Sequence, residues 1–308
     1  MARPQGTRVP SRGLRSRGGA SRGGVPRRTP AGVPVGSWRG WSWTRRGVAL
    51  LLAVLFLVPF YWVFVISLQQ GTTISSWPLD LVPQWHWANY SRAWDLTTWP
   101  RYFVNTVFVA ACTVLLCLAT SVLAGFAFGV LRFPGKKIIM GVVLSVLMVP
   151  TVTLIVPDFV IADELHLLNT YWIQIIPFGS SVFGIFLVRQ FFLTMPQEIL
   201  DAAAVDGAGR LRILWHIGVP AVRPALLLIG INVFVASWNS FLWPQIMVSN
   251  PSLQPIEVGL ASFTTDNGTD WSAMSAAVCF TTLPIMLLFL LLQRQFIRGA
   301  MTAAGSVK

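Results

Sequence analysis

Charged residues are scarce in this sequence, and their scarcity excludes the surface of an ordinary soluble protein. Only 11% of the 308 residues are charged and 54% are hydrophobic, with a mean hydropathy of +0.64. Soluble domains carry about 25% charged residues, so most of this surface is expected to face lipid. The three cysteines lie in apolar stretches without CxxC spacing, which excludes a disulfide framework or a thiolate metal site.

Catalytic motifs are also absent. The single Gly-Lys pair, Gly135-Lys136, is followed by Lys137 instead of Ser or Thr, and Val130 occupies the position of the upstream P-loop glycine. The chain therefore lacks a Walker A site of its own. The three histidines are scattered and form no HExxH motif. We expect no metal site, no cofactor bound by this chain and no enzymatic activity.

Basic residues are plentiful, and the net charge of +12 would suit a nucleic-acid partner. Their distribution argues against one, because 11 of the 23 Lys and Arg residues lie in an Arg- and Gly-rich tail over residues 1–46. We expect this tail to be disordered in the cytoplasm near anionic lipid. RNA binding is the alternative, but no aromatic residue is interleaved with the bases before Trp38.

Long apolar stretches follow the tail, and each approaches or exceeds the roughly 20 residues that cross a bilayer as a helix. No cleavage site follows the first stretch, so we interpret it as a retained helix. We predict an all-α polytopic membrane protein, with its transmembrane domain over residues 47–308. The six predicted spans cover residues 48–67, 105–130, 138–156, 171–192, 222–246 and 273–293.

The distribution of charge predicts the orientation of these spans. With the N-terminus in the cytoplasm, 21 of the 23 bases fall on the cytoplasmic side, and only Arg92 and Arg101 lie outside. This is a strong positive-inside signal. Both termini are then cytoplasmic, and a polar loop over residues 194–220 lies in the cytoplasm between the fourth and fifth spans.

The polar side chains near the centres of the spans are uncharged. No Asp, Glu, Lys or His lies at an apolar centre, which argues against a proton-coupled carrier but leaves open sodium held by backbone carbonyls. Trp238, Asn239 and Trp243 form a polar and aromatic cluster in the fifth stretch. Such side chains either line a path for a neutral polar solute or pack helices together, and both interpretations stay open.

The polar segment, residues 196–225, has the sequence PQEILDAAAVDGAGRLRILWHIGVPAVRPA and is expected to form two short helices. We expect Thr194 to cap the first helix and Pro196 to lie in its first turn. Glu198 and Asp201 then lie near the positive end of the helix dipole. Acids at the start of a helix, followed by three alanines, indicate a surface that a partner can approach closely.

A glycine and a proline divide the rest of the polar segment. We expect Gly207 to turn the chain at a point where a side chain would clash. Pro220 is expected to end the second helix just before the fifth span. A surface helix that merely rests on lipid is the alternative, which the bases Arg210 and Arg212 favour and the acids oppose.

The spacing of this segment resembles the EAA loop of ABC importer permeases, in which Gly follows EAA after three residues and I-x-L-P follows nine residues later. Here DAA at 201–203 precedes Gly207, and IGVP follows at 217–220, so Asp replaces Glu and Val replaces Leu. The chain also resembles the MalG-type subunits of the carbohydrate-uptake branch in the segments FLVRQFF, SWNSFLWP and QRQFIRGAMTAAGSVK. This resemblance covers residues 45–308. The residues assigned to the loop by this resemblance are Glu198, Asp201, Ala202, Ala203, Asp206, Gly207, Ile217 and Pro220.

The resemblance implies a type I ABC importer permease whose loop forms coupling helices in a cleft of a separate ATPase subunit. Closure of the ATPase on ATP and Mg would then switch the spans between inward- and outward-facing states. The implied partners are a second, MalF-like permease, two ATPase copies and an extracytoplasmic solute-binding protein. In this family the loop between spans five and six touches the binding protein, and here we place that contact at Asn250, Pro251 and Gln254.

The solute itself is less well defined than the machinery. The absence of a central Arg or Lys in the spans favours a neutral sugar, such as a disaccharide, over glycerol 3-phosphate, which the same branch also carries. An ion-gradient-driven transporter and a membrane anchor without transport activity are the alternatives from other classes.

Overall fold

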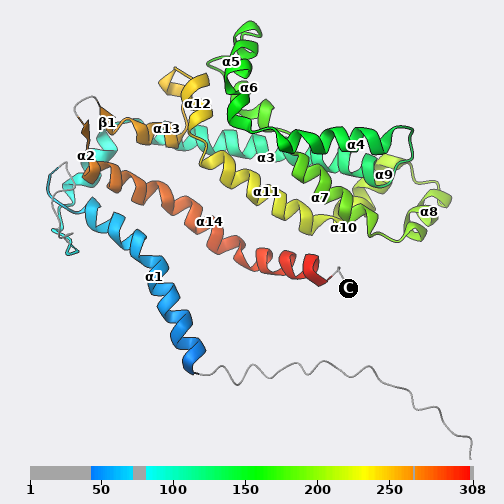
Figure 1. Cartoon of the computed structure of the whole chain (residues 1–308), viewed down its shortest axis with the longest axis horizontal. Helices are drawn as coiled ribbons and strands as arrows, with labels where there is room; N and C mark the ends of the chain where they lie inside the picture. The colour runs from blue at the N-terminus through cyan, green and yellow to red at the C-terminus, as the bar shows by residue number, and fades with distance from the viewer. Residues whose placement is uncertain (1–42, 72–80, 266–267, 306–308) are drawn as a thin grey trace, which may run out of the picture. The chain divides into compact units, whose positions relative to one another are not determined.

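The computed structural model describes residues 43–71, 81–265 and 268–305, and these residues are mostly helical (Figure 1). The chain divides into two units after Leu55, in the middle of helix α1 (Trp43–Ser67). All other helices and strands belong to the second unit. The disorder predicted for the tail falls on residues outside this description, except that the last four residues of the predicted tail already begin α1.

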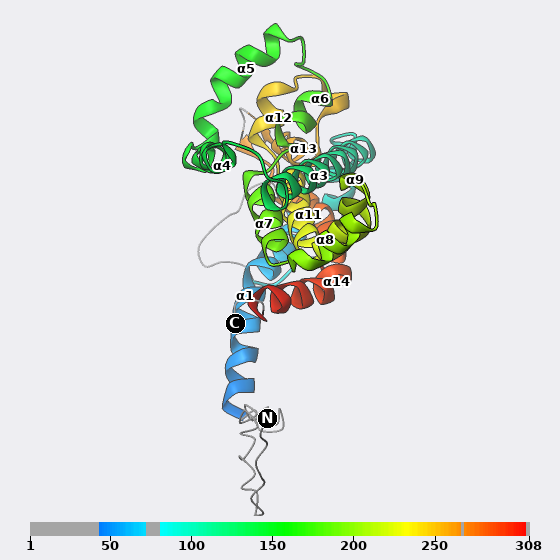
Figure 2. The same cartoon turned by 90° about the vertical axis from the view of Figure 1, so that its right-hand side faces the viewer.

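Helix α3 (Trp99–Gly129) lies at the centre of the helical packing in the second unit. It packs against α7 (Val182–Leu193) and α11 (Arg223–Trp238), and α14 (Trp271–Gly305) packs against α11 and α2 (Ala88–Asp95). Figure 2 shows α4 and α5 to one side of the group formed by α3, α7 and α11.

Small residues allow α3 and α7 to approach each other closely. A Cβ atom added at Gly125 would lie 2.5 Å from Val188 Cγ1, and one added at Gly129 would lie 2.6 Å from Phe192 Cβ. Helices within membranes gain much of their association energy from such close backbone packing, because lipid offers no hydrophobic driving force between them.

Two of the helices among the described residues are long and apolar enough to cross a membrane unaided, namely Arg46–Ser67 within α1 and α3. The number rises to five if each of three bent helix pairs counts as one span. Helix α14 contains a shorter apolar part, Trp271–Leu287, which begins two residues before the sixth predicted stretch and overlaps most of it. The second predicted span begins earlier than expected, because α3 starts at Trp99.

The third predicted span, residues 138–156, is not one straight helix but a bent pair of helices. The chain bends by 91° between Lys136–Met148 and Thr151–Glu164. Pro150 causes the break: it lacks a backbone N–H, and it disfavours helical backbone at Val149, which is extended (φ −88°, ψ 119°). The pieces are α4 (Lys136–Ser145), the 3₁₀ turns η2 (Val146–Met148) and η3 (Thr151–Leu154), and α5 (Ile155–Glu164).

The fourth and fifth predicted spans are also interrupted. The fourth consists of α6 (Trp172–Ile175) with the 3₁₀ turn η4 (Ile176–Phe178), followed after a 40° bend by α7. The fifth was predicted to continue to residue 246, but α11 ends at Trp238 and a separate helix α12 (Leu242–Met247) follows. Apolar composition alone does not reveal these ends, because the residues on both sides of each break are hydrophobic.

Short elements gather at the two ends of the long helices. One end carries α2, the 3₁₀ turn η6 (Pro251–Leu253), α13 (Ile256–Ala261) and the antiparallel strands β1 (Thr264–Thr265) and β2 (Gly268–Thr269). The opposite end carries the helices of the polar segment (Figure 1). These are α8 (Gln197–Val205), α9 (Arg210–Ile213), the π turn η5 (Leu214–Gly218) and α10 (Val219–Ala221).

Candidate functional site

The first helix of the polar segment begins differently from the sequence-based expectation. Thr194 does not cap α8: its hydroxyl donates to the Phe191 carbonyl at 2.8 Å, and Thr194 is the last residue of the turn that ends α7. Pro196 takes the N-cap position with extended ψ instead of lying in the first turn, and no side chain caps the helix. The predicted acid, Glu198, does lie in the first turn of α8.

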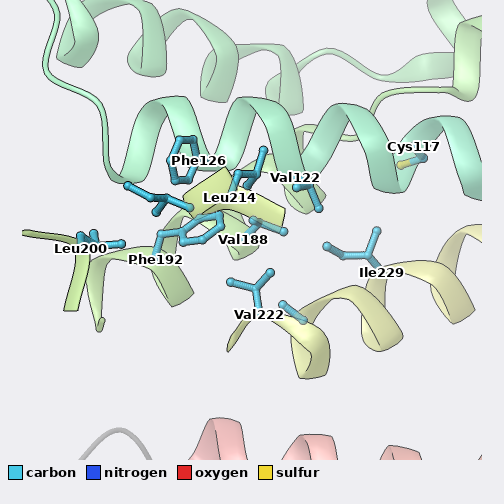
Figure 3. Packing of buried hydrophobic residues seen from close by; sticks show 11 residues of the cluster. Cys117, Val122, Phe126, Val188, Phe192, Leu200, Leu214, Val222 and Ile229 are labelled. Atoms are coloured by element: carbon cyan, nitrogen blue, oxygen red, sulfur yellow. The ribbon is translucent and has the colours of Figure 1, made fainter. Parts of the chain in front are cut away.

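Apolar side chains anchor the polar segment to the long helices. Leu200 from α8, Ile213 from α9 and Leu214 from the π turn are buried. They join a cluster with Phe126 of α3 and Phe192 of α7, whose rings lie 5.5 Å apart edge to face (Figure 3). This one cluster therefore packs α8 and α9 against α3 and α7.

The opposite face of the polar segment is open. Val205 is 87% exposed and Trp215 is 58% exposed, so apolar side chains accompany the acids at this surface. Within the described residues these acids form no ion pair, and Asp201 accepts only a long hydrogen bond from Gln197 Nε2 at 3.5 Å. Of the residues predicted here, Glu198, Asp201, Ala202, Asp206, Gly207 and Pro220 are exposed, while Ala203 and Ile217 are half-buried.

Gly207 ends α8 in a Schellman motif. Its N–H donates to the Ala204 carbonyl at 3.1 Å, and the Ala208 N–H donates to the Ala203 carbonyl at 3.0 Å. The φ angle of Gly207 is +78°, in the left-handed region. A Cβ atom at this position would meet nothing within 4 Å, so the expected steric clash was wrong and the backbone conformation explains the glycine.

Pro220 does not end the second helix, which is a further correction. Helical backbone continues from Arg210 to Ala221 and then bends by 76° into α11. Pro220 lies in the first turn of α10, where its missing N–H is tolerated, directly after the π turn in which Val219 N–H bonds to Leu214 O. The chain changes direction at Val222, whose φ and ψ (−94°, 7°) are not helical.

A cavity of about 500 Å³ lies between α3, α11, α12 and the bent third and fourth spans. Trp243, predicted to line a path, is one of its walls, whereas Asn239 is exposed and is not among the lining residues. Trp238 is 2% exposed and is packed with Trp99 and Ile256 in a separate hydrophobic cluster. The polar residues that line the cavity are Thr106, Thr113, Thr151, Asp158, Gln174, Ser180, Ser181, Asn232, Ser237 and Ser240.

Most of these polar residues were missed at the sequence level. Thr113, Gln174 and Asn232 are each a lone polar residue among apolar neighbours, and they come from three different predicted spans. Asp158 was assigned to an outer loop, but the bend at Pro150 directs α5 so that Asp158 lines the cavity. The only signal in the sequence was the polarity of each isolated position, which packing explains equally well.

The loop predicted to contact a binding protein lies at the other end of the molecule from the polar segment. Asn250 and Pro251 are exposed, and the Asn250 side chain caps η6 by accepting from Ser252 N–H at 3.0 Å. Gln254 is half-buried, and its side chain donates to the Val248 carbonyl at 3.0 Å. The tip is therefore accessible, whereas Gln254 helps to shape the loop.

Two side-chain amides, one buried and one exposed, hold this loop in place. Asn105 of α3 is fully buried, and its Nδ2 donates to the carbonyls of Ser252 and Gln254, both at 2.9 Å. Its Oδ1 accepts from the Tyr171 hydroxyl at 2.7 Å. Asn169 Oδ1 accepts from three donors in residues 249–250. This network joins the exposed loop to α3 and to the start of the fourth predicted span.

Comparison with known proteins matches residues 121–301 to the family described as "Binding-protein-dependent transport system inner membrane component". The "sn-glycerol-3-phosphate transport system permease protein UgpE" of Yersinia pestis is 30% identical over 262 residues, which cover 82% of this chain and 93% of that protein. The "Diacetylchitobiose uptake system permease protein NgcG" of Streptomyces coelicolor is 29% identical, covering 84% of each chain.

The fold also resembles that of solved structures. A chain of a bacterial ABC transporter involved in the import of the acidic polysaccharide alginate superposes with a TM-score of 0.70 at 22% identity, covering 83% of this chain and 99% of that chain. A second chain comes from a bacterial alginate ABC transporter in complex with alginate pentasaccharide-bound periplasmic protein, with a TM-score of 0.57 at 13% identity and coverages of 80% and 91%. The mostly helical chain therefore shares its fold with a chain of each of these transporters.

Proposed function

The chain belongs to the family of binding-protein-dependent transport system inner membrane components, and from this premise we propose that it is the permease subunit of an ATP-driven sugar or oligosaccharide importer. It is thus an inner-membrane transport protein and not an enzyme. The observation that carries the proposal is the polar segment, which is anchored on one face and open on the other.

The proposed coupling site is the open face of α8 and the turn that follows it. We assign contact with a separate ATPase subunit to the exposed acids Glu198, Asp201 and Asp206, to the alanines beside them, and to Gly207, Ile217 and Pro220. Leu200 and Leu214, on the opposite face, connect this site to the cluster between α3 and α7. Closure of the ATPase would then push α8 and move the long helices.

The proposed assembly contains a second, MalF-like permease, two ATPase copies that bind ATP and Mg, and an extracytoplasmic binding protein. The solved complex of an alginate transporter with its periplasmic protein supports the last of these partners by analogy of fold. We place the contact with the binding protein at the exposed tip formed by Asn250 and Pro251, with Gln254 shaping the loop. Six spans with both termini in the cytoplasm complete the proposed type I architecture.

The solute class follows from the relatives. Similar permeases are named for glycerol 3-phosphate and for diacetylchitobiose, at 30% and 29% identity, and the similar fold serves alginate import. A sugar or oligosaccharide fits most of this range. Glycerol 3-phosphate is the second candidate, because a relative named for it is as similar to this chain as the one named for a sugar.

The coupling proposal is tested in proteoliposomes that contain the complete importer and its loaded binding protein. Asp201→Arg should abolish ATP-driven uptake while the complex still inserts, because it places a cation where an acid faces the ATPase. Asp95→Arg makes the same charge change on an exposed residue of α2, at the other end of the molecule, and should retain uptake. Normal uptake by the Asp201→Arg variant would refute the coupling role, and gradient-driven uptake without the ATPase would revive the secondary transporter.

A further inference from the structure

The lining of the cavity between α3, α11 and α12 is polar but almost uncharged. Nine of its lining residues are neutral and polar, and Asp158 is the one charged residue among them. No Lys, Arg or His lines it in the part of the chain that the structure describes. Its volume of about 500 Å³ falls within the ~300–1,000 Å³ typical of small-molecule sites.

One buried hydroxyl in this cavity lacks a partner. Thr113 is 1% exposed, and its Oγ1 forms no hydrogen bond with any described residue. Thr106, on the same helix, donates to the Tyr102 carbonyl and accepts from Ile256 N–H. Threonines in helices usually bond to a preceding carbonyl in this way. The Thr113 hydroxyl therefore has an unmet hydrogen-bonding capacity that a ligand in the cavity would satisfy.

Other polar side chains in the cavity are also available. Asn232 and Ser237 of α11, together with Ser240, form no side-chain hydrogen bond among the described residues. Each offers both a donor and an acceptor. Hydroxyl groups of a sugar likewise donate and accept, so a sugar ring can satisfy this set of groups without any charge.

An aromatic wall completes the site. Trp243 Nε1 donates to the Ile173 carbonyl at 2.8 Å, which fixes the indole ring. The ring of Phe178 meets it edge to face, with centroids 5.3 Å apart. Because the indole N–H is already bonded, the ring contributes an apolar face to the cavity. A pyranose ring has an apolar C–H face and a hydroxyl-bearing edge, which match this wall and the other, polar lining residues.

We infer that this cavity binds an uncharged sugar unit of the transported solute, with Thr113 as a hydrogen-bonding residue, Trp243 as the apolar wall and Asp158 as the residue that disfavours anions. The inference rests on the proposed import function and selects one of its two solute classes. A phosphate or carboxylate solute would need a cation to replace its hydration, and the single charge here has the wrong sign.

A cysteine introduced into the cavity reports the sign of the cavity's charge. This measurement does not require the transported solute to be known. Ser237→Cys is introduced into the full complex after Cys112, Cys117 and Cys279 are replaced by Ala, and its reaction with cationic and anionic methanethiosulfonates is timed. We expect the cation to react faster, and Asp158→Asn to lower the cation-to-anion rate ratio by about fivefold. Asp163→Asn, on the same helix but not lining the cavity, is the matched control.

The same thiol reports ligand binding. Maltose, cellobiose and diacetylchitobiose are tested at millimolar concentration for protection against a neutral methanethiosulfonate, beside glycerol 3-phosphate. We expect at least one uncharged disaccharide to slow the reaction and glycerol 3-phosphate to have no effect. Thr113→Val should abolish the protection, whereas Thr113→Ser should retain it. The thermal stability of the unliganded Thr113→Val complex should be unchanged or higher, because the variant removes an unbonded hydroxyl.

The outcomes separate this inference from the proposed function. Protection by glycerol 3-phosphate, protection by none of the probes, or an unchanged charge ratio in Asp158→Asn would overturn the inference. ATP-driven uptake would still support the importer in each of these cases. Loss of stability in Thr113→Val would also count against the inference, because it would assign the hydroxyl a structural role.

Discussion

Gly207 allows a test that separates backbone conformation from side-chain contact. Both Gly207 and Gly209 have open space where a Cβ atom would lie, but only Gly207 has a positive φ angle. An L-residue in the left-handed region costs about 1–2 kcal/mol. We expect Gly207→Ala to lower the melting temperature of the purified complex and to reduce ATP-driven uptake, and Gly209→Ala to change neither.

An asparagine provides the second arm of this test, because Asn tolerates the left-handed region better than Ala. Gly207→Asn should therefore be milder than Gly207→Ala. Equal defects in both Gly207 variants would show that a small residue, and not the backbone conformation, is required at the surface of the turn.

We predict that the folding stability depends on pH through Glu257, which lies at the same end of the molecule as the loop of Asn250. Burial raises the pKa of this half-buried carboxyl, at the start of α13, above its ordinary value of 4.5. The folded state therefore binds more protons than the unfolded state above pH 4.5, and stability falls as the pH rises through the folded pKa.

Glu257→Gln removes this dependence. The difference in melting temperature between the variant and the unaltered complex should be smallest near pH 4.5, and it should grow in favour of the variant toward pH 7. A scan of thermal unfolding against pH provides the measurement. A difference that is constant across this range would mean that burial does not perturb the carboxyl.

At the scale of elements, we expect the attachment of α8 to the long helices to depend on Leu200. Its side chain is buried in the cluster with Phe126 and Phe192, whereas its neighbour Ile199 is 46% exposed. A buried Leu→Ala change costs about 2–5 kcal/mol. We expect Leu200→Ala to lower the thermal stability of the purified permease and to weaken uptake more than ATP hydrolysis, because α8 loses its anchor.

Ile199→Ala is the matched control, since it removes a similar apolar group from the open face. It should leave the stability of the permease unchanged, and any effect on uptake should come with weaker binding of the ATPase. If Leu200→Ala were as stable as Ile199→Ala, the cluster would not anchor the polar segment.

The same elements show what the sequence predicts well. The polar segment was predictable because Gly207, the acids and the bases interrupt two apolar stretches, and the structure places helices on both sides of that glycine. The 91° angle of the bend at Pro150 and the break after Trp238 were not anticipated, because hydropathy does not change across them. Capping at Thr194 was wrong because the hydroxyl bonds backward to α7, a choice that depends on the geometry of the preceding helix.

The cavity was the least predictable feature. Its polar residues are separated by more than a hundred positions, from Thr106 to Ser240, and each looks like an ordinary packing residue in its own span. Trp238 and Trp243 are close in sequence, yet the break between α11 and α12 directs one into a packed cluster and the other to the cavity. Only the tertiary fold distinguishes these roles.

For the whole molecule, the bases predict which end faces the cytoplasm. At the end that carries the polar segment, Arg189 Nε donates to the Phe128 carbonyl and Lys136 Nζ donates to the Leu131 carbonyl, near the C-terminal end of α3. Cations are stabilised at the C-terminal end of a helix. These contacts keep the two bases at the end of the molecule that carries the polar segment, and the positive-inside pattern places that end in the cytoplasm.

The 91° bend at Pro150 leaves two paths for the third stretch, which either crosses the membrane or returns to the cytoplasmic side. The side on which the later segments lie distinguishes the two. Alkaline phosphatase, which is active only outside the cytoplasm, is inserted after Asp95, His166, Gly207 or Lys308. If the bent third stretch crosses the membrane, the first two fusions should be active and the last two inactive. If it returns to the cytoplasmic side instead, the His166 fusion becomes inactive and the Gly207 and Lys308 fusions become active. That second pattern would put Arg210 and Arg212 outside and separate the polar segment from any ATPase, so it would refute the topology and the coupling proposal together.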